Sequence, residues 1–234
     1  MKKNVFLLLA LISLFLACQK NSEIKALFHR AEAMENDILK SIATIAECKK
    51  SYEQIFIKAP DSEYAAKACY KLGKLNEIFE HYDEALDYYQ KLLTVYPESP
   101  LAGEVLLAMA QIYHLHTDKW EQAISAYTQF VGLFPDAKEA LHAFLNIAEI
   151  YCQKEQWEAA LETYQSVLDK YPNHQICQSI VFRSADIYKF KLKNDAKAQA
   201  EYEYLMKSYP NSSWSALANQ RLMPVGEGEK NHEK

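Results

Sequence analysis

The sequence predicts an all-α fold, a solenoid of helical hairpins with four to five repeats and a C-terminal capping helix. Five prolines recur at intervals of 37 or 38 residues: Pro60, Pro97, Pro135, Pro172 and Pro210. Self-similarity at a period of 20–50 residues is typical of repeat proteins. The 234-residue chain also contains only five glycines, which disfavours β-hairpins because their tight turns rely on that residue.

The N-terminal segment is typical of an export signal. Lys2 and Lys3 precede an apolar run from Val5 to Ala17 that only Ser13 interrupts. A bilayer-spanning helix needs about 20 apolar residues, and this run is shorter. It matches the apolar region of a secretory signal peptide, so residues 1–17 are predicted to be one. A buried N-terminal helix is disfavoured because a core helix rarely lacks a polar face.

The end of this run, 14–18 (Leu-Phe-Leu-Ala-Cys), resembles the bacterial lipobox. In that motif a small residue precedes a cysteine that is lipidated and becomes the new N-terminus. The resemblance implies that Cys18 is lipidated, and Gln19 implies sorting to the outer membrane, facing the periplasm of a bacterial envelope. Acyl chains would then tether the protein to the membrane. The alternative is cleavage nearby by ordinary signal peptidase, which leaves Cys18 as a free thiol.

The second helix of each repeat carries a common pattern that ends at the proline. In one copy it consists of Ala85, Tyr89 four residues later, Leu92 with its neighbour, and then Tyr96-Pro97. Further copies start at alanines 123, 160 and 198. These offsets place the side chains on one helical stripe. The alanine lets two helices approach to about 8 Å, and the proline ends the helix.

A first helix precedes each of these second helices. In the first helix of residues 61–97, Leu72 and Gly73 lie twelve residues before Ala85. Together with Tyr89 and Pro97, these residues resemble the tetratricopeptide repeat, which implies a right-handed solenoid. The repeats are lengthened by three or four residues around the proline, which resembles envelope lipoproteins and periplasmic proteins of the BamD and YbgF (CpoB) types.

These patterns divide the chain into segments. The predicted organisation is a lipoprotein signal peptide (1–17), a lipidated N-terminus with a degenerate first repeat (18–60), four repeats (61–97, 98–135, 136–172 and 173–210), a capping helix (211–223) and a disordered tail (224–234). A capping helix is expected because the end of a solenoid must shield its core.

The four cysteines beyond the lipobox fall in helices of different repeats: Cys48, Cys69, Cys152 and Cys177. Their spacing forms no disulfide framework, and small buried apolar residues are the favoured interpretation. Pairing in an oxidising compartment is left open.

No catalytic or cofactor-binding motif is found. The sequence lacks a nucleophile elbow, a phosphate loop, a dinucleotide fingerprint and a paired-cysteine metal site. His114 and His116 are two residues apart and point in different directions on a helix, so no metal site is predicted. Trp120 and Trp157 occupy equivalent places before second helices, which favours packing against the hairpin turn over glycan binding. A net charge of −5 without a long basic run argues against nucleic acid as a partner.

The resemblance implies that the first helices line a concave groove. Their side chains that face away from the second helices are the candidate partner-binding residues: Lys67, Tyr70, Lys71, Lys74, Leu107, Gln111, His114, His142, Asn146, Glu149, Phe182, Arg183, Asp186 and Lys189. Mixed apolar and charged residues suit a peptide or a partner helix. A terminal-carboxylate clamp is not predicted, because Leu107, Gln111 and Ser179 replace its polar residues.

The sequence therefore predicts a non-enzymatic, lipid-anchored envelope scaffold without a cofactor. Its expected partners are envelope proteins, with β-barrel assembly components, as for BamD, the most concrete candidates. The alternatives are a periplasmic binding protein for a small molecule or glycan and a YbgF/CpoB-like constriction factor.

Overall fold

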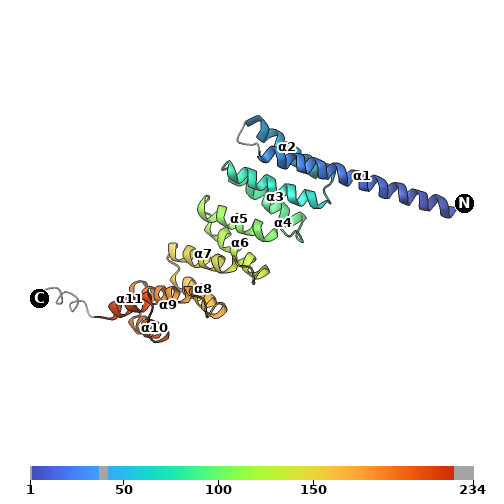
Figure 1. The fold of residues 1–234 in the computed structure, drawn as a ribbon. Coiled ribbons are helices and arrows are strands. Elements are labelled where there is room, and N and C mark those ends of the chain that lie inside the picture. Colours follow the sequence, from blue (N-terminus) through green and yellow to red (C-terminus); the bar gives the residue numbers. More distant parts are fainter. Residues whose placement is uncertain (1, 37–41, 224–234) are drawn as a thin grey trace. The chain divides into compact units, whose positions relative to one another are not determined.

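The computed structural model describes residues 2–36 and 42–223, with side chains described for 13–36 and 44–223. Every regular element in these ranges is a helix, as the repeat pattern predicts (Figure 1). The chain divides into two compact units, residues 1–119 (unit 1) and 120–234 (unit 2). The division falls inside the expected repeat 98–135. The expected tail, 224–234, lies outside the described residues.

Unit 1 is built from helical hairpins stacked side by side. Its described helices are α1 (Lys2–Asn36), α2 (Ile42–Lys58), α3 (Glu63–Ile78), α4 (Tyr82–Val95) and α5 (Ala102–Leu115). The pairs α1/α2 and α3/α4 form hairpins, α2 packs on α3, and α4 packs on α5. Two apolar clusters fill these contacts, one among α1, α2 and α3 and the other mainly among α3, α4 and α5.

Helix α1 joins the apolar N-terminal run to the first repeat without a break. Its residues 13–23 are exposed, and the described core begins at Ile24, which is 3% exposed. Among the described residues, no helix combines enough length with enough apolar character to cross a bilayer. No sequence signal marked the boundary between α1 and α2, and residues 37–41, between these helices, lie outside the described residues.

Unit 2 repeats the same arrangement. Its described helices are α6 (Trp120–Leu133), α7 (Ala140–Gln153), α8 (Trp157–Lys170), α9 (Ile176–Asp186), α10 (Asp195–Ser208) and α11 (Ser213–Leu222), with a π-helical segment, Ile187–Lys191, directly after α9. Helices α6, α7 and α8 pack in succession, and α9 pairs with α10. Helix α11 packs on both α9 and α10, and so acts as the capping helix.

The turns inside the hairpins share a left-handed backbone conformation that no glycine in the sequence indicates. One residue in each turn has a positive φ of 51° to 60°, and none is a glycine: Glu80, Asp118, Glu155 and Lys193. In the two shorter turns, the amides of His81 and Gln156 each reach back to a carbonyl five residues earlier. This pattern closes the C-terminus of a helix with a left-handed residue.

The two longer turns absorb one extra residue each. The amides of Lys119 and Asn194 reach back six residues, to Tyr113 and Tyr188. In the last repeat the extra residue is also accommodated by the π-helical segment, where the amide of Leu192 binds the carbonyl of Ile187. An insertion in a helix commonly takes this form.

Close helix packing explains the glycine in α3. A Cβ atom at Gly73 would lie 2.3 Å from Cε1 of Tyr89, whose ring is fully buried. Ala85, also fully buried, lies one turn before that tyrosine. By contrast, a Cβ atom at Gly132 in α6 would meet nothing within 4 Å. Of these two glycines, Gly73 is therefore the one that a close approach requires.

The four cysteines at positions 48, 69, 152 and 177 serve as packing residues. Cys48, Cys69 and Cys177 are buried and Cys152 is half-buried. All five cysteines of the chain lie within the described ranges, and none of them forms a disulfide. Burial raises the pKa of Cys48 to about 11 and that of Cys69 to about 12. Such thiols are protonated near neutral pH and therefore weak nucleophiles.

Candidate functional site

Five buried tyrosines form a regular row along the second helices of the repeats (α2, α4, α6, α8 and α10). They are Tyr52, Tyr89, Tyr127, Tyr164 and Tyr202, each at most 3% exposed. Every hydroxyl meets a polar group on a first helix (α1, α3, α7 or α9). A buried tyrosine hydroxyl requires such a partner. The first-helix residues that bind these hydroxyls therefore face the second helices, and the remaining polar residues of the first helices are available to bind a partner.

In unit 1 the partners are carboxylates that a lysine also contacts. The Tyr52 hydroxyl donates to Glu35 at 2.8 Å, and Lys71 lies 3.1 Å from the same carboxylate. The Tyr89 hydroxyl donates to Glu77 at 2.6 Å. Lys74 approaches Glu77 to 2.9 Å. Burial and these carboxylates raise the pKa of both tyrosines, so they are neutral donors.

The first-helix face of a unit is defined here as the surface formed by the candidate groove residues of that unit. In unit 1 these are Lys67, Tyr70, Lys71, Lys74, Leu107, Gln111 and His114. Lys67 pairs with Glu63 at 3.3 Å, and the Tyr70 hydroxyl donates to Glu104 at 2.9 Å. The four candidates of α3 are thus already engaged within the unit. Gln111 is exposed, and Leu107 and His114 are half-buried.

In unit 2 the candidates are His142, Asn146, Glu149, Phe182, Arg183, Asp186 and Lys189. Asn146, Glu149 and Arg183 come together in a cavity of about 230 Å³. The rest of its lining is Leu145, Tyr164, Ile176, Ser179 and Ile180. Apolar walls with a few convergent polar groups are the usual composition of a recognition pocket.

The polar groups of this cavity are loosely paired. The Arg183 guanidinium lies 3.9 Å from the Glu149 carboxylate, and both side chains are about half exposed, at 58% and 49%. A hydrogen bond with the Tyr164 hydroxyl raises the pKa of Arg183. Asn146 donates to the Tyr127 hydroxyl at 3.1 Å. Arg183 therefore presents a permanent positive charge that is open to a partner.

Three candidates in the last repeat lie elsewhere than expected. Phe182 is 7% exposed and packs beside Tyr202 and Trp214, so it belongs to the core and its assignment to the groove is wrong. Asp186 accepts from Tyr202 and lies 3.4 Å from Arg221 of α11. Lys189 donates to the backbone carbonyl of Arg221. The capping helix thus engages both charges.

A second regular feature lies at the hairpin turns. The first residue of α6, Trp120, carries Lys154 over its ring at 5.7 Å, and Trp157 of α8 carries Lys191 at 4.8 Å. In unit 1, Tyr82 stacks on His116 with a centroid distance of 4.3 Å. Each partner comes 34 residues later, from the next repeat. The tryptophans therefore pack against hairpin turns, as expected.

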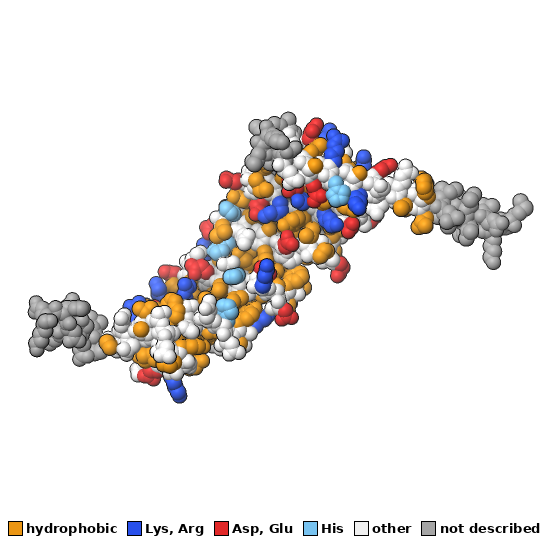
Figure 2. Space-filling model, in the orientation of Figure 1, with side chains coloured by type: hydrophobic (Ala, Val, Ile, Leu, Met, Phe, Trp, Pro, Cys, Tyr) orange, Lys and Arg blue, Asp and Glu red, His pale blue; other side chains and the backbone are white. Residues whose placement is uncertain are grey.

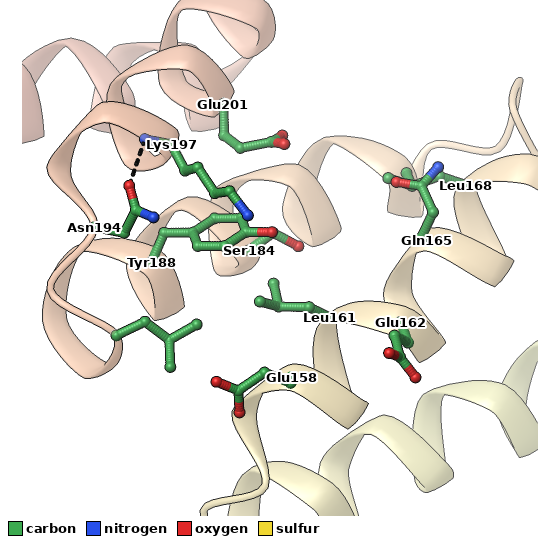
Figure 3. Close-up of a pocket in the computed structure, with 11 residues that line it drawn as sticks. Glu158, Leu161, Glu162, Gln165, Leu168, Ser184, Tyr188, Asn194, Lys197 and Glu201 are labelled. Atoms are coloured by element: carbon green, nitrogen blue, oxygen red, sulfur yellow. Dashed lines mark hydrogen bonds between the residues drawn. The ribbon is translucent and has the colours of Figure 1, made fainter.

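A larger cavity of about 560 Å³ lies between α8 and α10 of unit 2. Figure 3 shows Glu158 and Glu162 on the α8 wall, Glu201 on the opposite wall, and Lys197 extended over the ring of Tyr188. Burial raises the pKa of Glu201. No pattern in the sequence marks this cavity, because its lining comes from helices of two repeats.

The described residues contain no cluster of histidine, cysteine, aspartate or glutamate suited to a metal ion.

On the face that Figure 2 shows, charges of both signs lie among apolar side chains in each unit. Such a surface offers both charged and apolar contacts to a partner. The sequence did not identify Glu35 and Glu77 as partners of Tyr52 and Tyr89, although the tyrosine hydroxyls were a signal that such partners were needed.

Comparisons with known proteins agree with this architecture. Residues 66–184, just over half of the chain, match the family model of the soluble NSF attachment protein (SNAP), and residues 181–212 match a tetratricopeptide repeat model. A curated relative, the RNA polymerase-associated protein CTR9 of Caenorhabditis elegans, is 25% identical over 122 residues. Those residues are 52% of this chain, which spans only 10% of that relative.

Solved structures show the same fold. A tetratricopeptide repeat protein from Parabacteroides merdae superposes with a TM-score of 0.55 at 15% identity, covering 85% of this chain and 73% of that one. The MamA protein gives a TM-score of 0.53 at 12% identity, covering 85% and 97%. Likeness at this identity concerns the fold alone. By its family matches and its hairpin repeats, the chain belongs to the SNAP-type, tetratricopeptide-repeat family of helical proteins.

Proposed function

We propose that the chain is a lipid-anchored scaffold of the bacterial envelope that binds a partner protein through its first-helix faces. The observation that carries the proposal is the cavity beside Arg183. There an exposed cation, an exposed carboxylate and apolar walls converge on the face that the tyrosine row keeps open. Tetratricopeptide proteins are generally non-catalytic scaffolds, which agrees with this composition.

The partner suited to this cavity is a protein segment with an acidic residue beside an apolar one. An acidic group would pair with Arg183, and the apolar neighbour would contact Leu145 and Ile176. Arginine is a frequent anchor of protein interfaces, since its planar guanidinium pairs with a carboxylate through two hydrogen bonds. Lys71 and Lys74 contribute less, because each already contacts a carboxylate of its own unit.

The envelope location rests on the N-terminal sequence. Val5–Ala17 followed by Cys18 supports export and lipidation, with the protein held at the outer membrane facing the periplasm. The lengthened repeats favour the BamD type of role, in the assembly of outer-membrane β-barrel proteins. A YbgF/CpoB-like role in envelope constriction is the second candidate.

Site-specific photocrosslinking in cells tests the binding face. A photoreactive residue replaces Gln111, His142 or Ser179 on the first helices, which leaves Arg183 intact, and matched controls replace the exposed Gln90, Gln129 or Gln165 on the second helices. The proposal expects one crosslinked protein from the first-helix positions, strongest at Ser179, which lines the cavity beside Arg183. Crosslinks from the second-helix positions alone would contradict it. A saturable small ligand without any protein partner would instead support a small-molecule or glycan-binding protein.

Acyl labelling tests the anchor separately. Cys18→Ser removes the acceptor sulfur and is expected to abolish incorporation of labelled palmitate and to release the protein from membranes. Cys152→Ser is the control, because Cys152 is half-buried within unit 2 and is not expected to be acylated. Unchanged labelling of the Cys18→Ser protein would refute the anchor while leaving the binding face untouched.

A further inference from the structure

A groove of about 520 Å³ lies where α1 passes the C-terminal end of α2 in unit 1. Its lining is Lys20, Glu23, Ile24, Ala26, Leu27, Arg30 and Lys58. Three cations therefore face a single carboxylate, in a protein whose net charge is −5. Within the part of the chain that the structure describes, none of the three cations forms an ion pair. The groove is therefore positively charged in a protein whose net charge is negative.

Helical spacing gathers these groups on one side of α1. Lys20 and Leu27 are two turns apart, as are Glu23 and Arg30, so the four side chains form one stripe along the helix. Lys58 ends α2 next to this stripe. Its neighbour Ile57 is 81% exposed. An exposed apolar side chain beside basic residues is a typical composition of surfaces that lie in a membrane interface.

We propose that this basic groove, with Ile57, rests on the anionic headgroups of a membrane and lays unit 1 along its surface. The charge complementarity is direct, because each lysine or arginine near an anionic bilayer is attracted to it. The location of the groove also fits, since Lys20 lies two residues after the proposed acylation site at Cys18.

The proposal requires that α1 lies along the membrane surface and does not stand upright on it. Along a helix, Arg30 lies about 18 Å from Cys18, and exposed charges are screened beyond about 10 Å at 0.1 M salt. If α1 stood upright on the membrane, Arg30 would therefore contribute little. It contributes fully only if α1 lies close to the surface. The position of the groove rests on the proposed anchor, whereas its affinity for lipid does not.

Vesicle flotation of a chain that begins at Gln19 tests the groove without the acyl chain. This chain retains the described core, which begins at Ile24. It is mixed with vesicles of phosphatidylglycerol and phosphatidylethanolamine, or of phosphatidylcholine alone. We expect binding to the anionic vesicles only, weakened by high salt. The triple variant Lys20→Glu, Arg30→Glu and Lys58→Glu is expected to lose at least about 100-fold in partitioning, because removing three positive charges at roughly fivefold each already gives that loss.

A matched control reverses three exposed lysines of unit 2, at positions 138, 193 and 207, which changes the net charge equally. The control is expected to keep most of the binding, and circular dichroism checks that both variants are folded. Equal binding of the wild type and the groove variant would overturn the proposal, as would an equal loss in the control or equal binding to neutral vesicles. None of these outcomes bears on partner capture by the first-helix faces.

Discussion

In unit 1 the tyrosine hydroxyls of the second helices meet carboxylates, whereas in unit 2 two of the three corresponding hydroxyls meet an amide and a thiol. Glu35 and Glu77 each contact a lysine of the first-helix face as well. The lysines Lys71 and Lys74 on the first-helix face of unit 1 are therefore paired within the unit. In unit 2, Asn146 and Cys152 bring no carboxylate to Tyr127 and Tyr164, and Arg183 stays 58% exposed, 3.9 Å from Glu149. The same repeat pattern thus produces a first-helix face with paired lysines in unit 1 and one with an exposed arginine in unit 2.

The largest expected effect concerns the close packing in unit 1. Gly73→Ala places a Cβ atom 2.3 Å from the buried ring of Tyr89. The ring and its hydrogen bond to Glu77 must then shift, and we expect a loss of about 2 kcal/mol in the free energy of unfolding. Urea denaturation followed by circular dichroism measures it.

The control for this substitution lies in unit 2. Gly132→Ala meets open space in α6, and alanine favours a helix over glycine by about 1 kcal/mol. We therefore expect a small stabilisation. Equal effects of the two substitutions would show that the approach of Tyr89 to α3 does not limit packing.

The next prediction compares the tyrosine partners directly. Tyr89→Phe removes a hydrogen bond to a charged acceptor, typically worth about 1.5–3 kcal/mol, whereas Tyr127→Phe removes one to a neutral amide, worth about 0.5–1.5 kcal/mol. Both rings are buried and keep their packing. Chemical denaturation of the two variants should rank them in that order. The reverse order would remove the distinction between the two faces.

A smaller effect is expected at the turns, where both units should behave alike. Glu80 and Glu155 have φ values of 60° and 57°. Glycine adopts this conformation without the steric cost of a Cβ atom. Glu80→Gly and Glu155→Gly should each stabilise the protein by up to about 1 kcal/mol, measured by thermal or urea unfolding. Gln165→Gly, at an exposed residue inside α8, should destabilise it by about as much.

The smallest expected effect depends on pH and involves unit 2 alone. Burial raises the pKa of Glu201 above the ordinary value of a glutamate side chain. The ionised carboxylate is therefore less favourable in the folded than in the unfolded protein, and this penalty is present above the ordinary glutamate pKa. Glu201→Gln should raise stability at pH 7, and the gain should vanish below about pH 4.

The control for Glu201 is Glu162→Gln, at an exposed residue on the opposite wall of the same cavity. We expect no comparable dependence on pH there. Unfolding midpoints of both variants between pH 4 and pH 8 would decide the matter. A gain at Glu201→Gln that persists at pH 4 would show that side-chain packing, and not burial of charge, is the cause.

The arrangement of helices followed from local patterns in the sequence. The spacing of Pro97 and Pro135 set the repeat length, and the offset from Ala85 to Tyr89 identified the buried stripe. Both signals act within one repeat, so periodicity reveals them. The hairpin between α1 and α2 was not marked by a comparable pattern. The positive φ values of the turns were also unmarked, because no glycine occupies them.

The candidate site depended on contacts between repeats, which the sequence order does not reveal. Helical periodicity nominated both Phe182 and Arg183 for the groove, yet Phe182 packs beside Trp214 of the capping helix while Arg183 opens into a cavity. The two residues are adjacent and differ by a rotation of about 100°. Which of them a partner can reach depends on what packs against α9.

The sequence by itself determined that this protein is a helical repeat solenoid, because each repeat carries its own apolar stripe and helix-ending proline. The tertiary structure decided which polar residues remain available. Lys71, Lys74, Asp186 and Lys189 are engaged by neighbours from other helices. Arg183 lies 3.9 Å from Glu149 and contacts the Tyr164 hydroxyl, yet its side chain is still 58% exposed. A buried hydroxyl or charge needs a partner, and only the packing of successive hairpins determines which residue supplies it.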